Sequence, residues 1–221
     1  MQEHTHHDEH GHAHDHDAPG HGPHAPPQPD EKIHSYYQVL GLALKELLIE
    51  KGIVTPDEIR KAIEFRDSIT PAMGARIVAR AWTDAAYKRR LLADGSEAIK
   101  DFGLDMGGTR LVVVENTPAV HNMIVCTLCS CYPRAVLGLP PSWYKSREYR
   151  ARTVREPRSV LAEFGTRIAD DVEVRVHDST ADMRYLVLPM RPAGTEGMSA
   201  EALAALISRD SMIGVSLPLV P

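Results

Sequence analysis

The stretch MIVCTLCSC, residues 123–131, contains all three cysteines of the 221-residue chain. Its first three residues are apolar and two of them are β-branched, which is typical of a buried β-strand. The cysteines follow without a break, at positions 126, 129 and 131. The stretch therefore predicts a buried strand that leads straight into a cluster of thiols.

Other strand-like segments lie in the same part of the chain, because β-branched runs or clean alternation recur at residues 111–114, 172–176 and 184–188. Segments with helical patterns are interspersed with them, at residues 142–152, 157–164 and 199–208. We therefore expect residues 104–221 to form an α+β domain that carries the thiol cluster.

Residues 33–103 have helical patterns instead. Apolar residues recur at helical spacing over residues 33–51, and Gly52 follows as a stop signal. Thr55-Pro56 and Thr70-Pro71 each combine a capping residue with a first-turn proline, which opens two further helices. The apolar surface of these helices is too small for a core of their own. We therefore expect a helical arm that packs on another surface.

Residues 1–32 form a low-complexity segment, and nine of the twelve histidines lie within residues 1–24. Such a composition cannot bury apolar surface, so we expect disorder there. Imidazole suits divalent cobalt, nickel and zinc, and one hypothesis is a labile buffer for such an ion. The alternatives are a solvated tail without a role and part of an expression tag.

Bulk properties exclude several classes of protein. The net charge of −5 gives no reason to expect a nucleic-acid partner. Neither a secretory signal nor an apolar run of membrane-spanning length is visible, so we expect a cytoplasmic protein without a membrane partner. Three clustered cysteines in such a chain favour metal or redox chemistry over a disulfide framework.

The spacing of the cysteines allows four kinds of site. A zinc site needs a fourth protein ligand, for which His121 is the nearby candidate. A redox pair of Cys126 and Cys129 leaves Cys131 unexplained, and an iron–sulfur cluster usually takes four cysteines. In the fourth reading the backbone itself chelates a metal.

This backbone chelate follows from the connectivity of Cys129-Ser130-Cys131. The thiolates of Cys129 and Cys131 and the deprotonated amide nitrogens of Ser130 and Cys131 close one six-membered and two five-membered rings around a metal. Cys126 can cap one axial position, and the other stays open for water or substrate. Amidate and thiolate donors suit low-spin trivalent cobalt or iron rather than zinc.

The sequence around the cysteines, residues 125–133, resembles the metal-binding signature of nitrile hydratase α subunits. The likeness extends from about residue 36 to the C-terminus. Further matching stretches are ENTP (115–118), LGLPPSWYKS (137–146), YRAR (149–152), VREPR (154–158), RPAGTEG (191–197) and RDSMIGV (209–215).

The resemblance implies a helical arm followed by a layered α/β/β/α globular domain that carries the metal. Cys126, Cys129 and Cys131 would supply the sulfur ligands, and Ser130 and Cys131 the amide nitrogens. It also implies oxidation of Cys129 to a cysteine sulfinic acid and of Cys131 to a cysteine sulfenic acid. Thr127 between the first two cysteines marks the form with one Co(III) per chain, whereas the Fe(III) form has serine there.

The resemblance also implies an enzyme of nitrogen compound metabolism, a lyase that hydrates a small nitrile to the amide. Cys129, Ser130 and Cys131 would form its catalytic centre. Oxidised sulfurs in a buried site need cationic partners. In the family, two arginines of a β subunit supply them, so we expect an αβ heterodimer or α2β2 heterotetramer. An activator or metallochaperone would act during maturation.

Four residues are candidates for the surroundings of the metal or for contact with the substrate, namely Thr127, Arg134, Asp178 and Arg184. Asp178 and Arg184 flank a turn between two late strands and match a family pair near the site. The alternative is that they are ordinary charged residues at the surface or at a strand end. Arg134 stands where many nitrile hydratases have tryptophan. Thiocyanate hydrolase, a close relative with the same cobalt ligands, also tends to have a basic residue there, and its substrate is an anion.

An alternative of another class is a cobalt-binding chaperone or regulator that acts through the histidine-rich segment. A chaperone needs labile binding, whereas a chelate of amidates and thiolates is inert. Retention of cobalt against a chelator distinguishes these hypotheses.

Overall fold

The structure, a computed structural model, describes residues 35–129 and 131–221. The predicted histidine-rich segment and Ser130 lie outside the described residues. The chain divides into two compact units after Thr55. In the described ranges no helix is both long and apolar enough to cross a membrane.

The first unit contains helix α1, Tyr36–Glu50, which the apolar spacing predicted. Ser35 and Gln38 form a reciprocal cap, because the hydroxyl of Ser35 accepts from the Gln38 amide and the Gln38 side chain accepts from the Ser35 amide. No residue of α1 is buried. A single exposed helix with large apolar side chains is marginal in water. This exposure is consistent with the predicted packing arm.

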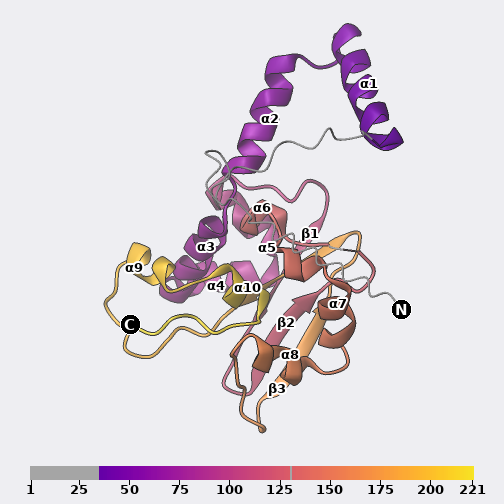
Figure 1. Cartoon of the computed structure of the whole chain (residues 1–221). Coiled ribbons are helices and arrows are strands. Elements are labelled where there is room, and N and C mark those ends of the chain that lie inside the picture. The colour runs from indigo at the N-terminus through magenta and orange to yellow at the C-terminus, as the bar shows by residue number, and fades with distance from the viewer. Residues whose placement is uncertain (1–34, 130) are drawn as a thin grey trace, which may run out of the picture. The chain divides into compact units, whose positions relative to one another are not determined.

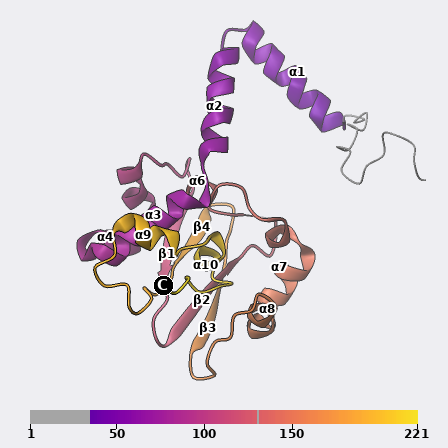
Figure 2. The ribbon, with the colours of Figure 1, turned by 60° about the vertical axis from the view of Figure 1, so that its left-hand side comes forward.

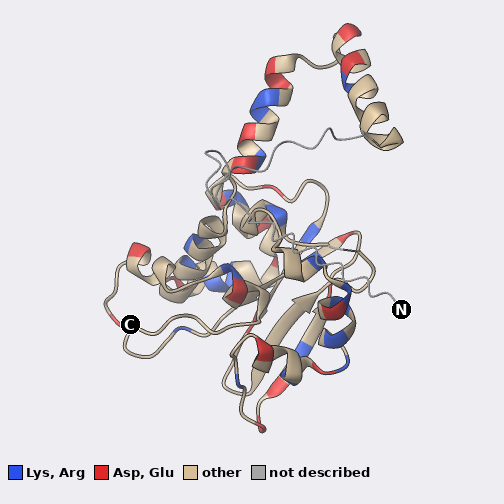
Figure 3. Ribbon diagram, in the orientation of Figure 1, with Lys and Arg blue, Asp and Glu red and all other residues tan. Residues whose placement is uncertain are grey.

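The second unit begins with helix α2, Pro56–Ser68, as the Thr55-Pro56 signal predicted. Charged side chains run along this helix (Figure 3). Arg60 pairs with Asp57 and, at 2.8 Å, with Glu64, and Lys61 pairs with Asp57 at 2.8 Å. All of these groups are exposed, so each pair contributes only a few tenths of a kcal/mol.

The four predicted strands form two parallel pairs (Figure 1). Strand β1, Arg110–Glu115, pairs with β4, Met183–Leu188, and β2, Val120–Val125, pairs with β3, Glu173–Asp178. Val125 lies opposite Asp178 in the second pair. Parallel partners need crossover connections, and the helices after the cysteines supply one between β2 and β3.

The other helices are α3 (Pro71–Thr83), α4 (Ala85–Ala93), α5 (Gly95–Ala98), η1 (Ile99–Phe102), α6 (Arg134–Leu137), η2 (Ser142–Lys145), α7 (Arg147–Thr153), α8 (Pro157–Glu163), α9 (Ala200–Ala205) and α10 (Arg209–Ile213). Helices α4 and α5 pack on β1, whereas α7 packs on β2 and α8 on β3 (Figure 2). The unit is thus a mixed helix-and-strand structure with helices on both strand pairs, as predicted.

The predicted helix over residues 142–152 is divided in the structure. A 3-10 turn, η2, ends at Lys145, and α7 begins at Arg147. Ser146 between them is extended, with its hydroxyl accepting from the amide of Tyr149 at 3.1 Å. Serine at this position favours the start of a new helix over the continuation of the preceding turn. Its hydroxyl oxygen accepts a hydrogen bond from a backbone N–H of the first helical turn that would otherwise have no partner.

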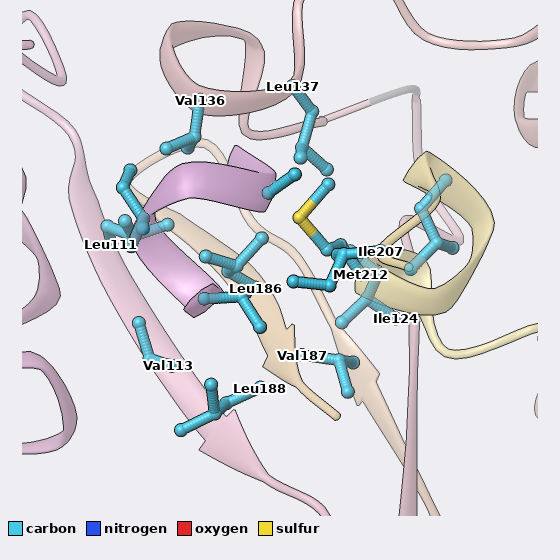
Figure 4. Packing of buried hydrophobic residues seen from close by; sticks show 14 of the residues in the cluster. Leu111, Val113, Ile124, Val136, Leu137, Leu186, Val187, Leu188, Ile207 and Met212 are labelled. Carbon is cyan, nitrogen blue, oxygen red and sulfur yellow. The ribbon is translucent and has the colours of Figure 1, made fainter. Parts of the chain in front are cut away.

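The core lies between the strands and the surrounding helices (Figure 4). Leu186, Val187 and Leu188 of β4 are fully buried, as are Ile77 and Val78 of α3. Helix α3 therefore belongs to the core of the second unit. The functional division into an arm over residues 33–103 and a catalytic domain over residues 104–221 stays a prediction.

A buried polar group joins β2 to the end of α10. His121 is 3 % exposed, and its Nε2–H donates to the carbonyl of Gly214 at 2.8 Å. Its Nδ1 lies 3.2 Å from the amide nitrogen of Asn116 and accepts from it. The acceptor role of Nδ1 needs the neutral ring, and burial holds the pKa of His121 below its ordinary value of 6.5 although the hydrogen bond to Gly214 acts the other way.

Acid is expected to destabilise the chain through this histidine. The unfolded chain takes up the proton first, so stability is complete above pH 6.5 and is lost as the pH falls from there toward the lowered pKa. The slope is at most about 1.4 kcal/mol per pH unit for one group. Urea unfolding at pH 7.5 and 5.5 measures how much of the free energy of unfolding is lost between these pH values. This loss should be smaller for His121→Gln than for the unchanged chain. Equal losses would contradict the prediction.

Candidate metal centre

The three cysteines converge at the end of β2. Cys126 is buried directly after the strand, Cys129 is exposed and Cys131 is partly buried. The sulfur of Cys129 lies 3.3 Å from that of Cys126 and 3.1 Å from that of Cys131. All three sulfurs lie within 4.8 Å of one another. One ion can therefore contact all three.

The spacing of the sulfurs tests the kind of ion. Two sulfurs bound at about 2.3 Å lie about 3.3 Å apart at a right angle and about 3.8 Å apart at the tetrahedral angle. The observed 3.3 and 3.1 Å fit right-angled coordination better. Among the described residues no histidine or carboxylate joins the cluster. His121, the candidate fourth zinc ligand, is engaged with Gly214 instead. The three sulfurs fit a single thiophilic ion, and the described residues add no fourth side-chain ligand for a tetrahedral zinc site.

The metal-free thiol of Cys131 resists ionisation. Burial, the hydrogen bond with Cys129 and the neighbouring Cys126 raise the pKa of Cys131 above its ordinary value, and Arg184 partly offsets this. A bound cation reverses this balance, because thiolates bind metals and thiols do not.

Asp178 holds the first turn of the cysteine loop. Its carboxylate accepts from the Thr127 amide at 2.9 Å and from the Thr127 hydroxyl at 2.5 Å. The parallel register of β2 and β3 makes this contact possible, because Val125 and Asp178 lie opposite each other at the strand ends. Thr127 and Asp178 are both predicted from the sequence to lie near the metal, and in the structure they contact each other.

Arg184, the other predicted member of the pair, is near enough for its charge to act on Cys131, but its hydrogen bonds go to the turn before β4. Its guanidinium donates to backbone carbonyls of the turn before β4, those of Thr180, Ala181 and Met183. Within residues 35–129 and 131–221 no ion pair joins it to Asp178. Arg184 instead lines a hollow of about 610 Å³ together with Arg134, the first residue of α6, and Tyr132. Exposed apolar residues of α2 and the loop before Pro140 complete its wall, namely Ile63, Phe65 and Leu139.

Three residues that were not predicted from the sequence contact the loop or the strand that leads into it. The hydroxyl of Tyr144 donates to the carbonyl of Cys131 at 2.9 Å, and Nη1 of Arg150 donates to that of Cys129 at 2.8 Å. The hydroxyl of Tyr149 donates to the Ile124 carbonyl at 2.7 Å. Burial raises the pKa of both tyrosines, so they remain donors. Their only sequence signal was their place within family-like stretches.

Loss of the Asp178 carboxylate is expected to loosen the loop. Asp178→Ala removes both acceptors for Thr127, each worth about 1 kcal/mol, and we expect about tenfold faster loss of bound metal to a chelator. Asp178→Asn keeps one side-chain oxygen and should lose metal at an intermediate rate. Asp182→Ala changes an exposed aspartate of the neighbouring turn and serves as the control. Equal rates for Asp178→Ala and Asp182→Ala would refute the role of Asp178.

Fold and loop together define a metal-binding protein of the α+β class whose ligands come from one short loop. Residues 35–216 match the family model described as nitrile hydratase, alpha chain. The chain belongs to this family.

Individual relatives agree with this assignment. The chain is 54 % identical over 181 residues to the low-molecular-weight cobalt-containing nitrile hydratase subunit alpha of Rhodococcus rhodochrous, covering 81 % of this chain and 87 % of that protein. It is 50 % identical over 189 residues to the cobalt-containing nitrile hydratase subunit alpha of Pseudonocardia thermophila, covering 84 % and 93 %. A solved recombinant thiocyanate hydrolase with partially modified cobalt centres superposes with a TM-score of 0.75 at 40 % identity, covering 84 % and 91 %.

Proposed function

We propose that this chain is the metal-binding subunit of a cobalt-type nitrile hydratase, which adds water to a nitrile to form the amide. The observation that carries the proposal is the convergence of three sulfurs within 4.8 Å in a loop of the family pattern. Cys126, Cys129 and Cys131 would hold the ion through sulfur, and Ser130 and Cys131 through their amide nitrogens.

Bound cobalt would supply a Lewis acid for the hydration. The chain's own residues would do the rest. Once oxidised, Cys131 would offer an oxygen that either takes a proton from the incoming water, whose oxygen then adds to the nitrile carbon, or adds to that carbon itself and is replaced on sulfur by the oxygen of water as the product leaves. Asp178 and Thr127 keep the loop in place, and the hollow beside Tyr132 offers apolar contacts and two arginines to the substrate. The imidate product tautomerises to the amide, so no oxidant or reductant is consumed.

The support for cobalt rather than iron comes mainly from the relatives, whose names include cobalt. Thr127 is the residue that marks the cobalt form, and its hydroxyl bonds to Asp178. Serine would make the same hydrogen bond, so this contact alone does not select the metal.

A second chain is needed to complete the site. Leu128, in the middle of the cysteine loop, is 88 % exposed, and Cys129 is exposed as well. A β subunit that covers this loop would bury the oxidised sulfurs and supply their cationic partners, and the apolar face of α1 would dock on it. The assembly would be αβ or α2β2, loaded by an activator or metallochaperone.

The proposal is tested on the chain co-expressed with its β subunit. One cobalt per α chain, a mass gain of about three oxygens on that chain and formation of amide from a small nitrile would support it. Cobalt that leaves at once to a chelator, or a complex without hydration activity, would overturn it. Rapid loss of metal would favour the chaperone hypothesis, in which the histidine-rich segment binds the ion.

Thiocyanate hydrolysis is the second candidate, and Arg134 favours it. Two cations, Arg134 and Arg184, line one hollow beside the cysteine loop, which suits an anion. Turnover of thiocyanate and of a neutral nitrile should be compared for the unchanged enzyme and for Arg134→Trp. A thiocyanate hydrolase would lose thiocyanate turnover selectively, whereas a nitrile hydratase would process the nitrile in both forms.

A further inference from the structure

Arg150 brings a positive charge to the backbone of the cysteine loop. Its Nη1 donates to the carbonyl oxygen of Cys129 at 2.8 Å. Its Nε lies 3.4 Å from the carbonyl of Ser146, one turn earlier in the chain. The side chain is partly buried and is held at two points, so its guanidinium is directed at the loop.

The carbonyl that Arg150 contacts belongs to the peptide group whose nitrogen is that of Ser130. In the proposed ligand set this nitrogen binds the metal as an amidate. Peptide resonance shares the negative charge of an amidate between nitrogen and carbonyl oxygen. A guanidinium at that oxygen forms a charge-assisted hydrogen bond, which is stronger than one between neutral groups. The contact thus places positive charge where metal binding creates negative charge.

The helix that carries Arg150 is fixed to the strand that carries the cysteines. Tyr149, the preceding residue, is 5 % exposed, and its hydroxyl bonds to the carbonyl of Ile124 in β2. The hydroxyl of Thr153 bonds to the Tyr149 carbonyl at 2.6 Å within α7. Adjacent residues of α7 therefore hold the end of β2 and the middle of the loop, and the distance between these two anchors is fixed by the helix.

Arg184 and Arg134, the predicted cations near the site, have other contacts, although the charge of Arg184 acts on the Cys131 thiol. The guanidinium of Arg184 is bonded to the turn at residues 180–183, and Arg134 lines the hollow. Tyr144 holds the carbonyl of Cys131, but it is neutral, and that carbonyl belongs to the peptide of Tyr132 rather than to a proposed ligand nitrogen.

We infer that Arg150 is a positioning residue of the metal centre: it stabilises the metal-bound peptide between Cys129 and Ser130 by neutralising the charge on its carbonyl oxygen. The inference rests on the proposed function. The role of Arg150 concerns the retention of the metal and its electronic environment, and no contact with the substrate is inferred.

The experiment compares four complexes co-expressed with the β subunit in cobalt: the unchanged chain, Arg150→Met, Arg150→Lys and the control Arg147→Met. Arg147 is an exposed arginine at the start of the same helix. The readouts are cobalt per α chain, the thiolate-to-cobalt absorption band and the rate of cobalt loss to a chelator, with thermal melting as the check on folding.

Arg150→Met should shift the absorption band and lose cobalt about 10- to 100-fold faster than the unchanged complex. Arg150→Lys should restore part of the retention, because the charge is kept and the forked geometry is lost. Arg147→Met should match the unchanged complex. If Arg150→Met does not fold, Arg150→Gln takes its place. This variant keeps a hydrogen-bond donor without the charge, and the same shift of the band and the same faster loss of cobalt are expected.

Equal retention and an identical band in Arg150→Met, or in Arg150→Gln where that variant decides, would overturn the inference while leaving the proposed function intact. Failure of the proposed function is recognised separately, because the unchanged complex itself would then lack inert cobalt or form no amide.

Discussion

Cys131→Ala is expected to abolish cobalt retention and to lower nitrile hydration by about a thousandfold or more, because the Lewis acid supplies several kcal/mol of transition-state stabilisation. Cys131 is proposed to provide both a sulfur and an amide nitrogen, and its oxidised sulfur is proposed to take part in the reaction. Its sulfur lies 3.1 Å from that of Cys129, so its removal opens the cluster directly. Cobalt analysis and amide formation by the co-expressed complex measure the effect.

Thr127→Ser is the matched control within the same loop. It keeps the hydroxyl that donates to Asp178 and removes one methyl group. Cobalt content and turnover should therefore remain close to those of the unchanged enzyme. Full activity of Cys131→Ala with bound cobalt would refute the assignment of this residue, and a Thr127→Ser enzyme that took up iron instead would show that the methyl group selects the metal.

Gly214→Ala is expected to lower the free energy of unfolding by about 3–5 kcal/mol, from backbone strain and a steric clash together. Gly214 has φ +89°, and an added Cβ would lie 2.0 Å from the carbonyl oxygen of Asn122 and 2.9 Å from Cα of Met123. Both atoms belong to the backbone of β2, which cannot yield without moving the strand that carries Cys126. Since a domain is stabilised by only about 5–15 kcal/mol, the variant should be close to unfolding.

Gly165→Ala separates the two causes. Gly165 has φ +79°, but nothing lies within 4 Å of an added Cβ. Gly165→Ala should therefore lower the free energy of unfolding by the cost of backbone strain alone, about 1–2 kcal/mol. Urea unfolding of both variants at one pH gives the difference. Equal losses would mean that the close approach of Gly214 to β2 contributes nothing.

Much of the local structure was predictable from the sequence because its causes are local. The β-branched run before Cys126 became β2, and the proline-led signals at Thr55 and Thr70 became the starts of α2 and α3. Ser146 is the instructive exception. The helical pattern ran through it, but its hydroxyl made a better start for α7 than a position inside a longer helix.

The proposed ligands of the metal centre could be predicted from the order of the amino acids alone, because all three sulfurs and both proposed amide nitrogens lie within six consecutive residues. Such a chelate depends on covalent connectivity and on the turn that the loop makes. The residues that surround the loop, by contrast, are brought to it by the packing of distant elements. Asp178 reaches Thr127 through the parallel register of β2 and β3, and Arg150 reaches Cys129 through the docking of α7. These contacts join residues 51 and 21 positions apart, and no local periodicity encodes such pairings.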